Sequence, residues 1–378
     1  MRKAAIINWA VYRLAGWNRR QAKTFRWRVG IYQSGRLGDF VLSLGAIRRI
    51  VDHVGEDHCV LFCSAVARQL AALEFPRLHR VELPELDGKL WITRRNLRTP
   101  AFAASVAPGV EQMICLRHYR YLYDEMALQQ IPARQVWCVE NSPVYRLEYE
   151  LVRSRFAGDV SVPRPLAQSD DHICEDLRCH QALLSAWLGR AIAPNEVLPR
   201  IERPEVLVGN CFAVSPFAST TIRDLPFKAL RAGIRQAAEQ WGLDACLLAP
   251  PREQARYEQL AQHLRDAGAP VSVTVTADIP ALVQALAASA MVLTADTATA
   301  HLATALNRPM VCLLGGGQYG CFGPWIVSRR QTWVSHPMDC YHCHWECRHP
   351  EPYCITGITP DRLMQAMQTI WNTTTPSR

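Results

Sequence analysis

Several features that would assign this 378-residue chain to a simple class are absent from its sequence. There is no low-complexity tract and no repeat of the period that solenoid proteins show, which excludes disordered and repeat architectures. The first 28 residues contain no acidic residue and carry eight basic ones, which equal the whole net charge of +8. The rest of the chain is therefore close to neutral, so a nucleic-acid-binding body is not indicated.

The basic N-terminal arm, residues 1–28, also has apolar residues at helical spacing, which include Ile6, Ala10, Leu14 and Trp17. Such a helix can lie at a membrane interface, or it can pack on its own domain or on another subunit. Arg13 interrupts an apolar run that is already too short to span a bilayer, and no small-residue cleavage site follows. We therefore expect a cytoplasmic protein, peripheral on the inner membrane if the arm binds there.

Fourteen cysteines are many for a chain without an export signal. Ten are scattered through the sequence, mostly in apolar segments, where thiols in a reducing cytoplasm behave as small buried hydrophobes. Four are clustered at Cys340, Cys343, Cys347 and Cys354. Soft thiolates at this spacing suit tetrahedral zinc or iron, and the alternative is a metal-free cluster of packed, reduced cysteines.

Short apolar runs alternate with helical patterns along most of the chain, which is typical of parallel α/β sheets. Strands are predicted over 28–33, 59–63, 112–116, 135–139, 211–215, 245–248, 271–275, 291–294 and 310–314. Helices are predicted over 40–54, 65–73, 170–188, 226–241, 252–267, 280–288, 297–306 and 361–371. We expect two doubly wound, Rossmann-like domains facing across a cleft, over 29–200 (which includes a linker) and 201–378. The second domain includes a Cys-rich loop over 340–354 and the final helix.

Residues 291–317 join a buried strand, a polar turn, a helix and a second buried strand. Asp296 or Thr297 supplies the helix N-cap, and Asn307-Arg308-Pro309 ends the helix. Because open α/β sheets bind ligands at the carboxyl ends of strands, and helix N-termini favour anions, this turn predicts a phosphate-bearing ligand.

Three separated motifs lie in turns of this pattern: Ser34-Gly-Arg-Leu-Gly-Asp39, Ser215-Pro-Phe-Ala-Ser219 with Arg223-Asp-Leu-Pro226, and Asp296-Thr-Ala-Thr-Ala-His301-Leu-Ala. In this order they resemble the motifs of glycosyltransferase family 9, the ADP-heptose heptosyltransferases of GT-B fold. Ala249-Pro-Pro-Arg-Glu253 is a weaker fourth match. Ala298 and Phe217 stand where the family commonly has glycine, so we expect a donor pocket of different shape, and another nucleotide sugar is an open alternative.

The resemblance implies a role for each matched residue. Asp39 is expected as the general base, and the alternative is that it only caps a helix. Arg223, in place of the family's lysine, is expected to grip the diphosphate in a forked geometry. The other expected donor-binding residues are Ser219, Thr220, Glu253, Asp296, Thr297 and His301, although a lone histidine can also be a core residue.

The Cys-rich segment, together with Gly315 to Phe322, resembles the branch of this family that modifies bacterial autotransporter proteins and carries an iron-binding cysteine finger. Cys321 is then a fifth candidate ligand, and the iron or zinc is structural, with no cofactor for catalysis. We predict an inverting glycosyltransferase that moves heptose from ADP-heptose to lipopolysaccharide core or a bacterial protein, with a homo-oligomer left open. A GT-B nucleotide-sugar epimerase and a non-catalytic binding or scaffold subunit are the alternatives.

Overall fold

The computed structural model describes residues 24–84, 97, 99–106, 108–142, 159–165, 173–203 and 207–374. Most of the predicted N-terminal arm, residues 1–23, lies outside the described residues. The chain divides into two compact units, one of Met1–Leu166 with Asp176–Val197 and one of Ala167–Glu175 with Leu198–Arg378. Among the described residues, no helix combines the length and apolar character that crossing a membrane requires.

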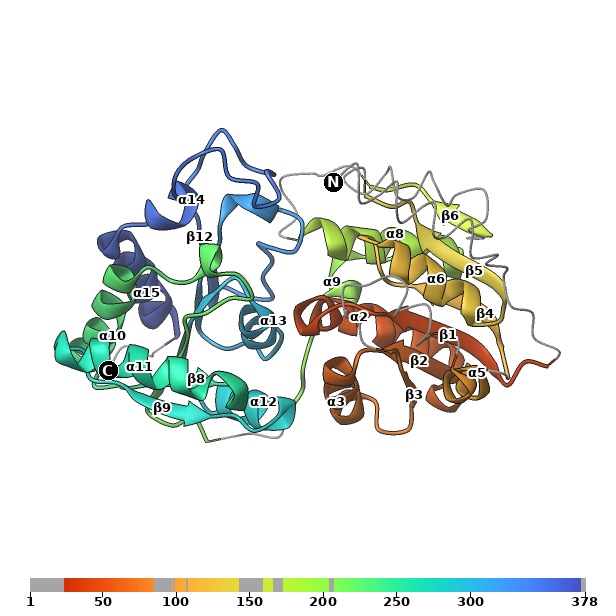
Figure 1. Ribbon diagram of the computed structural model, residues 1–378, viewed down its shortest axis with the longest axis horizontal. Helices are drawn as coiled ribbons and strands as arrows, with labels where there is room; N and C mark the ends of the chain where they lie inside the picture. The colour runs from red at the N-terminus through yellow and green to blue at the C-terminus, as the bar shows by residue number, and fades with distance from the viewer. Residues whose placement is uncertain are drawn as a thin grey trace. The chain divides into compact units, whose positions relative to one another are not determined.

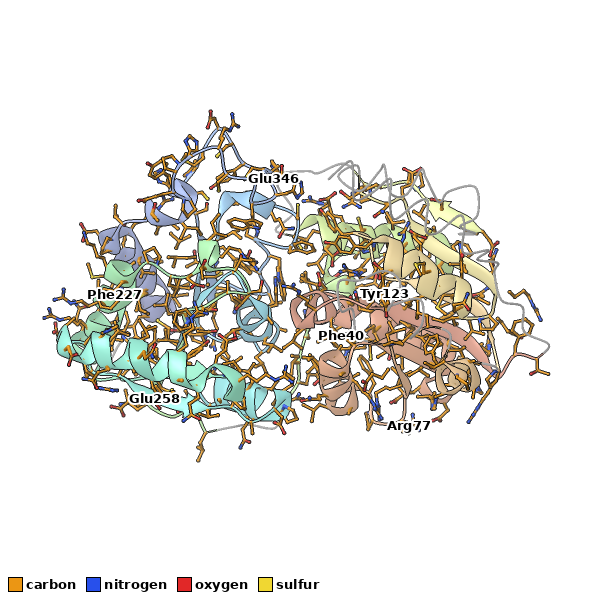
Figure 2. All side chains as sticks on the ribbon, viewed as in Figure 1. Phe40, Arg77, Tyr123, Phe227, Glu258 and Glu346 are labelled. Atoms are coloured by element: carbon orange, nitrogen blue, oxygen red, sulfur yellow. The ribbon has the colours of Figure 1, made fainter. Side chains whose placement is uncertain are left out.

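The first unit is built on a parallel six-stranded sheet of order β3-β2-β1-β4-β5-β6 (Figure 1). Its strands are β1 (Trp27–Gln33), β2 (Cys59–Cys63), β3 (His79–Glu82), β4 (Val110–Cys115), β5 (Ala133–Val139) and β6 (Val160–Val162). Its helices are α2 (Leu37–Val54), α3 (Ala65–Glu74), α5 (Pro100–Val106), α6 (Leu122–Gln130), α8 (Glu175–Leu188) and α9 (Pro194–Val197), with a 3-10 turn over Glu56–His58. Figure 2 shows Phe40 on α2 and Tyr123 on α6, and both side chains are buried in this unit.

Helix α2 begins earlier than the sequence pattern predicted. The sequence indicated a turn through Asp39, but the helix starts at Leu37 and places Asp39 in its first turn. The Asp39 carboxylate accepts a hydrogen bond from the backbone N–H of Arg36 at 2.8 Å, which closes a capping box. A polar first turn therefore belongs to the helix and not to the loop before it.

The second unit has a parallel six-stranded sheet of order β12-β11-β10-β7-β8-β9. Its strands are β7 (Cys211–Ser215), β8 (Asp244–Ala249), β9 (Ser272–Val275), β10 (Met291–Ala295), β11 (Met310–Leu313) and β12 (Gln331–Val334). Its helices are α10 (Phe227–Trp241), α11 (Gln254–Asp266), α12 (Ile279–Ala287), α13 (Ala298–Ala305), α14 (Tyr353–Thr356) and α15 (Pro360–Thr374). Short 3-10 turns cover Thr221–Arg223, Pro251–Glu253 and Gly316–Gln318.

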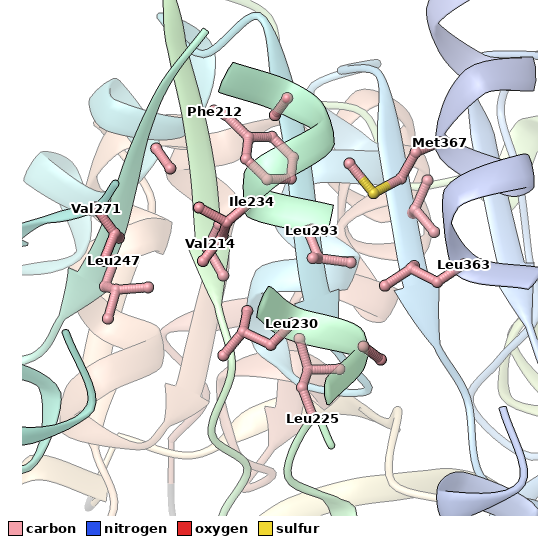
Figure 3. Close-up of a cluster of buried hydrophobic side chains, with 14 of the residues drawn as sticks. Phe212, Val214, Leu225, Leu230, Ile234, Leu247, Val271, Leu293, Leu363 and Met367 are labelled. Atoms are coloured by element: carbon pink, nitrogen blue, oxygen red, sulfur yellow. The ribbon is translucent and has the colours of Figure 1, made fainter. Parts of the chain in front are cut away.

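The core of the second unit forms where α10 and α15 pack on its sheet (Figure 3). Gly233 on α10 lets the two helices approach closely, because a Cβ there would lie 3.1 Å from Sδ of Met367 on α15. The rings of Trp241 and Trp371 stack at 4.9 Å at the ends of the same two helices. Helix α15, although last in the chain, is therefore part of this core.

Both sheets follow one Rossmann pattern. In chain order within each unit, the strands lie as third, second, first, fourth, fifth and sixth, and all described pairs are parallel. The order reverses between β1 and β4 in the first unit and between β7 and β10 in the second. Ligands of open α/β sheets bind at these reversal points, beyond the carboxyl ends of the strands. The predicted fold of two Rossmann-like α/β domains is confirmed.

Candidate functional site

The reversal point of the second unit brings two of the three sequence motifs together. Strands β7 and β10 are hydrogen-bonded neighbours, and Ser215 at the end of β7 pairs with Thr294 on β10. The turn that follows β7 ends at Arg223, and Asp296 follows β10 directly. Two segments 73 residues apart in sequence thus form one polar site.

Arg223 is the centre of this site. Its guanidinium donates hydrogen bonds to the Ser219 hydroxyl at 2.5 Å, to the Thr220 hydroxyl at 3.3 Å and to the Asp296 backbone carbonyl at 3.3 Å. Its Nη1 also lies 3.9 Å from the Asp296 carboxylate, and its side chain is 17% exposed. Ser219 and Thr220 therefore hold the arginine in place, and the guanidinium is fixed at a partly open edge where an anion can reach it.

Asp296 and Thr297 form the start of α13. Burial raises the pKa of Asp296, and the nearby Arg223 opposes that shift. Of the two predicted N-cap candidates, Thr297 is the N-cap, and its hydroxyl accepts a hydrogen bond from the Thr299 backbone N–H at 3.2 Å. Ala298 is the first helical residue. It is not one of the described non-glycine residues with positive φ. The positive end of the α13 dipole thus lies beside Arg223, and both favour a bound anion.

A second layer fixes the turn after β7. Asp224 accepts a hydrogen bond from the Ala218 backbone N–H at 2.8 Å and pairs with Arg256 of α11. The Arg256 guanidinium lies 3.6 Å from the centre of the Phe217 ring and also contacts Glu253, at 3.4 Å. Phe217, which replaces a common glycine, therefore anchors this turn to α11. Glu253 itself is half-exposed at the carboxyl end of β8, next to β7.

His301 lies one helical turn into α13 and is buried. Its Nδ1 accepts a hydrogen bond from Trp325 Nε1 at 2.9 Å, so the ring proton is on Nε2. The ring also stacks on Trp325 and lies 5.8 Å from the Trp333 ring. The structure thus places His301 in an aromatic pocket below the start of α13, with its orientation set by Trp325.

The Cys-rich loop docks on the glycine turn that follows β11. Backbone N–H groups of His342 and His344 donate to the carbonyls of Gly316 and Gly317, each at 2.9 Å. A Cβ on Gly316 would lie 2.2 Å from the Tyr341 ring, so only glycine allows this contact. The loop then places Trp345 with its ring 5.6 Å from the Arg223 guanidinium. The cysteine segment and the anion site are therefore physically connected.

Two of the four clustered thiols, Cys347 and Cys354, have a raised pKa to which neighbouring cysteines contribute. Desolvation is the largest cause that raises the pKa of Cys347, and the neighbouring Cys343, Cys354 and Cys340 raise it further. Desolvation also raises the pKa of Cys354, and Cys340 and Cys343 add to this shift. A backbone hydrogen bond from Gly316 acts in the opposite direction and lowers the pKa. A cation would relieve this repulsion, so the donor set suits a soft metal ion.

The tightest group of potential ligands in this loop is different from the predicted one. Among the described residues, the ligand atoms that lie within 4.8 Å of one another there belong to Asp339, Cys340 and His349. Cys321, the fifth candidate, is buried just after the glycine turn. The choice of ligands therefore stays a prediction.

In the first unit, Asp39 lies at the reversal point between β1 and β4. Its Oδ1 is 3.3 Å from Arg117 Nη1, its Oδ2 accepts the helix-capping hydrogen bond, and its side chain is 18% exposed. Burial alone would lower the pKa of Arg117, but Asp39, Asp124 and Asp176 raise it above its ordinary value. Asp39 is thus both a helix cap and one half of an ion pair at the carboxyl edge of the first sheet.

Four contributors to these sites were missed by sequence reasoning: Asp224, Arg256, Arg117 and Trp345. Asp224 directly follows Arg223 within a recognised motif, so its polarity was a usable signal. The other three act through contacts between distant segments, which no local pattern reveals.

The model of glycosyltransferase family 9 (heptosyltransferase) matches residues 214–352, a span that contains every predicted donor residue and three of the clustered cysteines. Among curated proteins the sequence finds no match.

Solved structures share the fold. E. coli heptosyltransferase WaaC with ADP-2-deoxy-2-fluoro heptose gives a TM-score of 0.63 at 16% identity, covering 90% of this chain and 99% of that chain. E. coli ADP-heptose lps heptosyltransferase II gives a TM-score of 0.62 at 13% identity, covering 92% of this chain and 99% of that chain. The iron-containing dodecameric glycosyltransferase TibC from enterotoxigenic E. coli H10407 gives a TM-score of 0.52 at 12% identity, covering 94% of this chain and 78% of that chain. Residues 214–352 therefore match a glycosyltransferase family 9 domain, which supports an enzyme.

Proposed function

We propose that this enzyme transfers heptose from ADP-heptose to an acceptor hydroxyl with inversion at the anomeric carbon. The observation that carries the proposal is the fixed guanidinium of Arg223 beside the N-terminus of α13, at the reversal point of the second sheet. These two groups supply a full and a partial positive charge where a nucleotide diphosphate would leave. Structures that share the fold are described with ADP and with ADP-2-deoxy-2-fluoro heptose.

The donor is expected to bind in the second unit. Arg223, with Ser219 and Thr220, faces the diphosphate together with Thr297 and the first-turn amides of α13. Glu253, half-exposed at the end of the adjacent strand β8, is the expected partner of the ribose hydroxyls. His301 contributes by supporting the start of α13 through its hydrogen bond with Trp325.

Asp39 is the proposed general base. Its carboxylate takes the proton from the acceptor hydroxyl while that oxygen forms a bond to the anomeric carbon. The bond from the anomeric carbon to the diphosphate oxygen breaks on the opposite side, and ADP leaves with its charge balanced by Arg223. Arg117 holds the carboxylate of Asp39 in place through their ion pair at 3.3 Å.

Metal is assigned no step in this reaction. A zinc or iron ion held by Cys340, Cys343, Cys347 and Cys354, or with Cys321 in place of one of them, would cross-link the Cys-rich loop. Its effect on donor binding would pass through the loop, which contacts the glycine turn by two backbone hydrogen bonds.

The acceptor is proposed to be either lipopolysaccharide core or a bacterial autotransporter protein. The basic arm, residues 1–28, suits an anionic inner-membrane surface, whereas the Cys-rich loop resembles that of the protein-modifying branch of the family. The proposed location is the cytoplasm, with peripheral membrane contact through the arm. A homo-oligomer is proposed by analogy with the dodecameric TibC.

A donor screen followed by a transfer assay tests the proposal. Thermal shift with a panel of nucleotide sugars should show the largest rise in Tm with ADP-heptose. Purified enzyme should then release ADP with one of the two acceptors, and Asp39→Asn should bind ADP-heptose normally but lose transfer. Near-normal turnover by Asp39→Asn would remove the base assignment. An isomerised nucleotide sugar without ADP release would support an epimerase, and binding without either product would support a scaffold.

A further inference from the structure

We propose a second metal site, for a zinc-class divalent ion, inside the first unit at His118, Asp176 and His180. One potential ligand atom from each of the three side chains lies within 4.8 Å of the other two. This site shares no residue with the clustered cysteines or with the anion site, and it does not depend on the proposed reaction.

Two elements bring the three residues together. Asp176 and His180 are four residues apart on α8, so they share one face of that helix. His118 comes from the segment that follows β4, and its ring centre lies 4.6 Å from that of His180. Nε2 of His118 is 3.9 Å from the Asp176 carboxylate. A helical Asp-x3-His pair facing one histidine from a neighbouring loop is an arrangement that holds metal ions well.

The two histidines are buried without enough hydrogen-bond partners. His118 is 1% exposed and neither of its ring nitrogens has a partner, while His180 is fully buried and its Nδ1 has none. Buried polar atoms are normally paired, so these three nitrogens call for an explanation. A metal ion would use one nitrogen from each ring and would remove most of this deficit.

The remaining nitrogen of His180 supports ligation. Its Nε2 lies 3.2 Å from the Leu116 backbone carbonyl, so the ring donates there and leaves the Nδ1 lone pair facing the group. Metal-binding histidines commonly donate their other N–H to a carbonyl in this way, which fixes tautomer and ring orientation.

Neighbouring cations are compensated. Arg117 pairs with Asp39 at 3.3 Å, and Arg120 pairs with Glu125 at 2.9 Å. Arg164 donates to two backbone carbonyls and lies over the Tyr119 ring. Asp176 supplies the carboxylate oxygen of the group.

The donor set selects the class of ion. Two imidazoles and one carboxylate suit zinc or cobalt better than magnesium or calcium, which prefer oxygen ligands. Ligand atoms of a tetrahedral zinc site lie about 3.3 Å apart. Side-chain rotations that shift the ligand atoms by about 1 Å would therefore close the group on the ion. Three protein ligands leave a fourth position for water.

The test measures metal content of the full-length protein after loading with Zn²⁺ and removal of excess. Wild type should hold one equivalent more than His180→Gln and than Asp176→Asn. His263→Gln, which changes an exposed histidine on α11, is the matched control and should keep the wild-type content. Loading with Co²⁺ should leave the thiolate charge-transfer band of the cysteine cluster unchanged in the two site variants.

Folding of each variant is checked by circular dichroism. Equal metal content in wild type and in a folded His180→Gln would overturn the proposal. If the variants do not fold, crystals of Zn²⁺-loaded wild type decide the question by anomalous scattering at the zinc edge. A peak among His118, Asp176 and His180 supports the site, and its absence when metal is present at the cysteines overturns it.

Discussion

Replacing Arg223 is the sharpest test of the donor site, because one side chain connects all of its parts. The guanidinium holds the Ser219 and Thr220 hydroxyls and the Asp296 carbonyl, and it is 17% exposed. Arg223→Ala removes both the charge and the forked set of guanidinium N–H donors. Arg223→Lys keeps the charge and removes only the forked donors. The two variants therefore separate the contribution of charge from that of geometry.

The expected magnitudes follow from the contacts. Charge-assisted hydrogen bonds contribute about 1.5–3 kcal/mol each. Loss of a two-point grip on a diphosphate should thus weaken ADP binding about 100-fold in Arg223→Ala and about tenfold in Arg223→Lys. Arg223→Ala also leaves the Asp296 carboxylate, which is 10% exposed, without its nearest cation, and should lower the free energy of unfolding by about 1 kcal/mol.

Isothermal titration with ADP measures the affinity, and urea unfolding measures the stability. Arg235→Ala is the control, because Arg235 is a half-exposed residue of α10 paired with Glu239 at 2.7 Å. Its loss should change stability by less than about 0.5 kcal/mol and leave ADP binding unchanged. If folded Arg223→Ala binds ADP as tightly as wild type, the diphosphate does not bind at Arg223 and the donor-site assignment fails.

Three further predictions concern the loop, the glycine turn and acid stability. Trp345→Ala should raise the KM for the donor about three- to tenfold with little change in kcat, since the ring lies against Arg223 and touches no proposed base; steady-state kinetics with an unchanged KM would contradict this. Gly316→Ala should lower the free energy of unfolding by about 1–3 kcal/mol, because the new Cβ would meet the Tyr341 ring at 2.2 Å; an unchanged urea midpoint would show that the loop moves freely. The pKa of Glu196 is lowered to about 2, first by a hydrogen bond from Arg190, so its stabilisation is present above pH 4.5 and is lost as the pH falls from 4.5 towards 2. Glu196→Gln should flatten that part of the stability profile in urea unfolding at pH 5 and pH 3, and an unchanged slope would refute the assignment.

Much of the fold follows from local patterns in the sequence. Buried apolar runs such as Cys59–Cys63 and Cys211–Ser215 are strands with the bounds that were predicted, because both faces of a parallel strand are covered. Strands β3, β6 and β12 were missed, since each has only three or four residues and is partly exposed. Short edge strands carry too few apolar residues to be separated from loop, and their pairing partners are distant in sequence.

The site was predictable where its residues cap or begin an element. Thr297 is the N-cap of α13, and the turn after β7 presents Arg223, because both follow from strand–turn–helix patterns. The role of Asp39 as a capping-box residue was considered, but its partner Arg117 was not foreseen. The His118 cluster shows the same limit, since only Asp176 and His180 are at helical spacing and His118 joins them through the fold.

The glycine turn shows how two apparently separate features of the sequence become one. The cysteines and the proposed phosphate-binding motifs look independent, but the rings of Tyr341 and Trp345 fit against Gly315–Gly317 only because those residues lack side chains. Backbone hydrogen bonds fix the loop there, and Trp345 then reaches the guanidinium of Arg223. A metal bound by the cysteines would consequently influence the donor without touching it, by deciding how firmly Trp345 is held. Donor affinity should therefore respond to chelation in wild type and lose that response in Trp345→Ala.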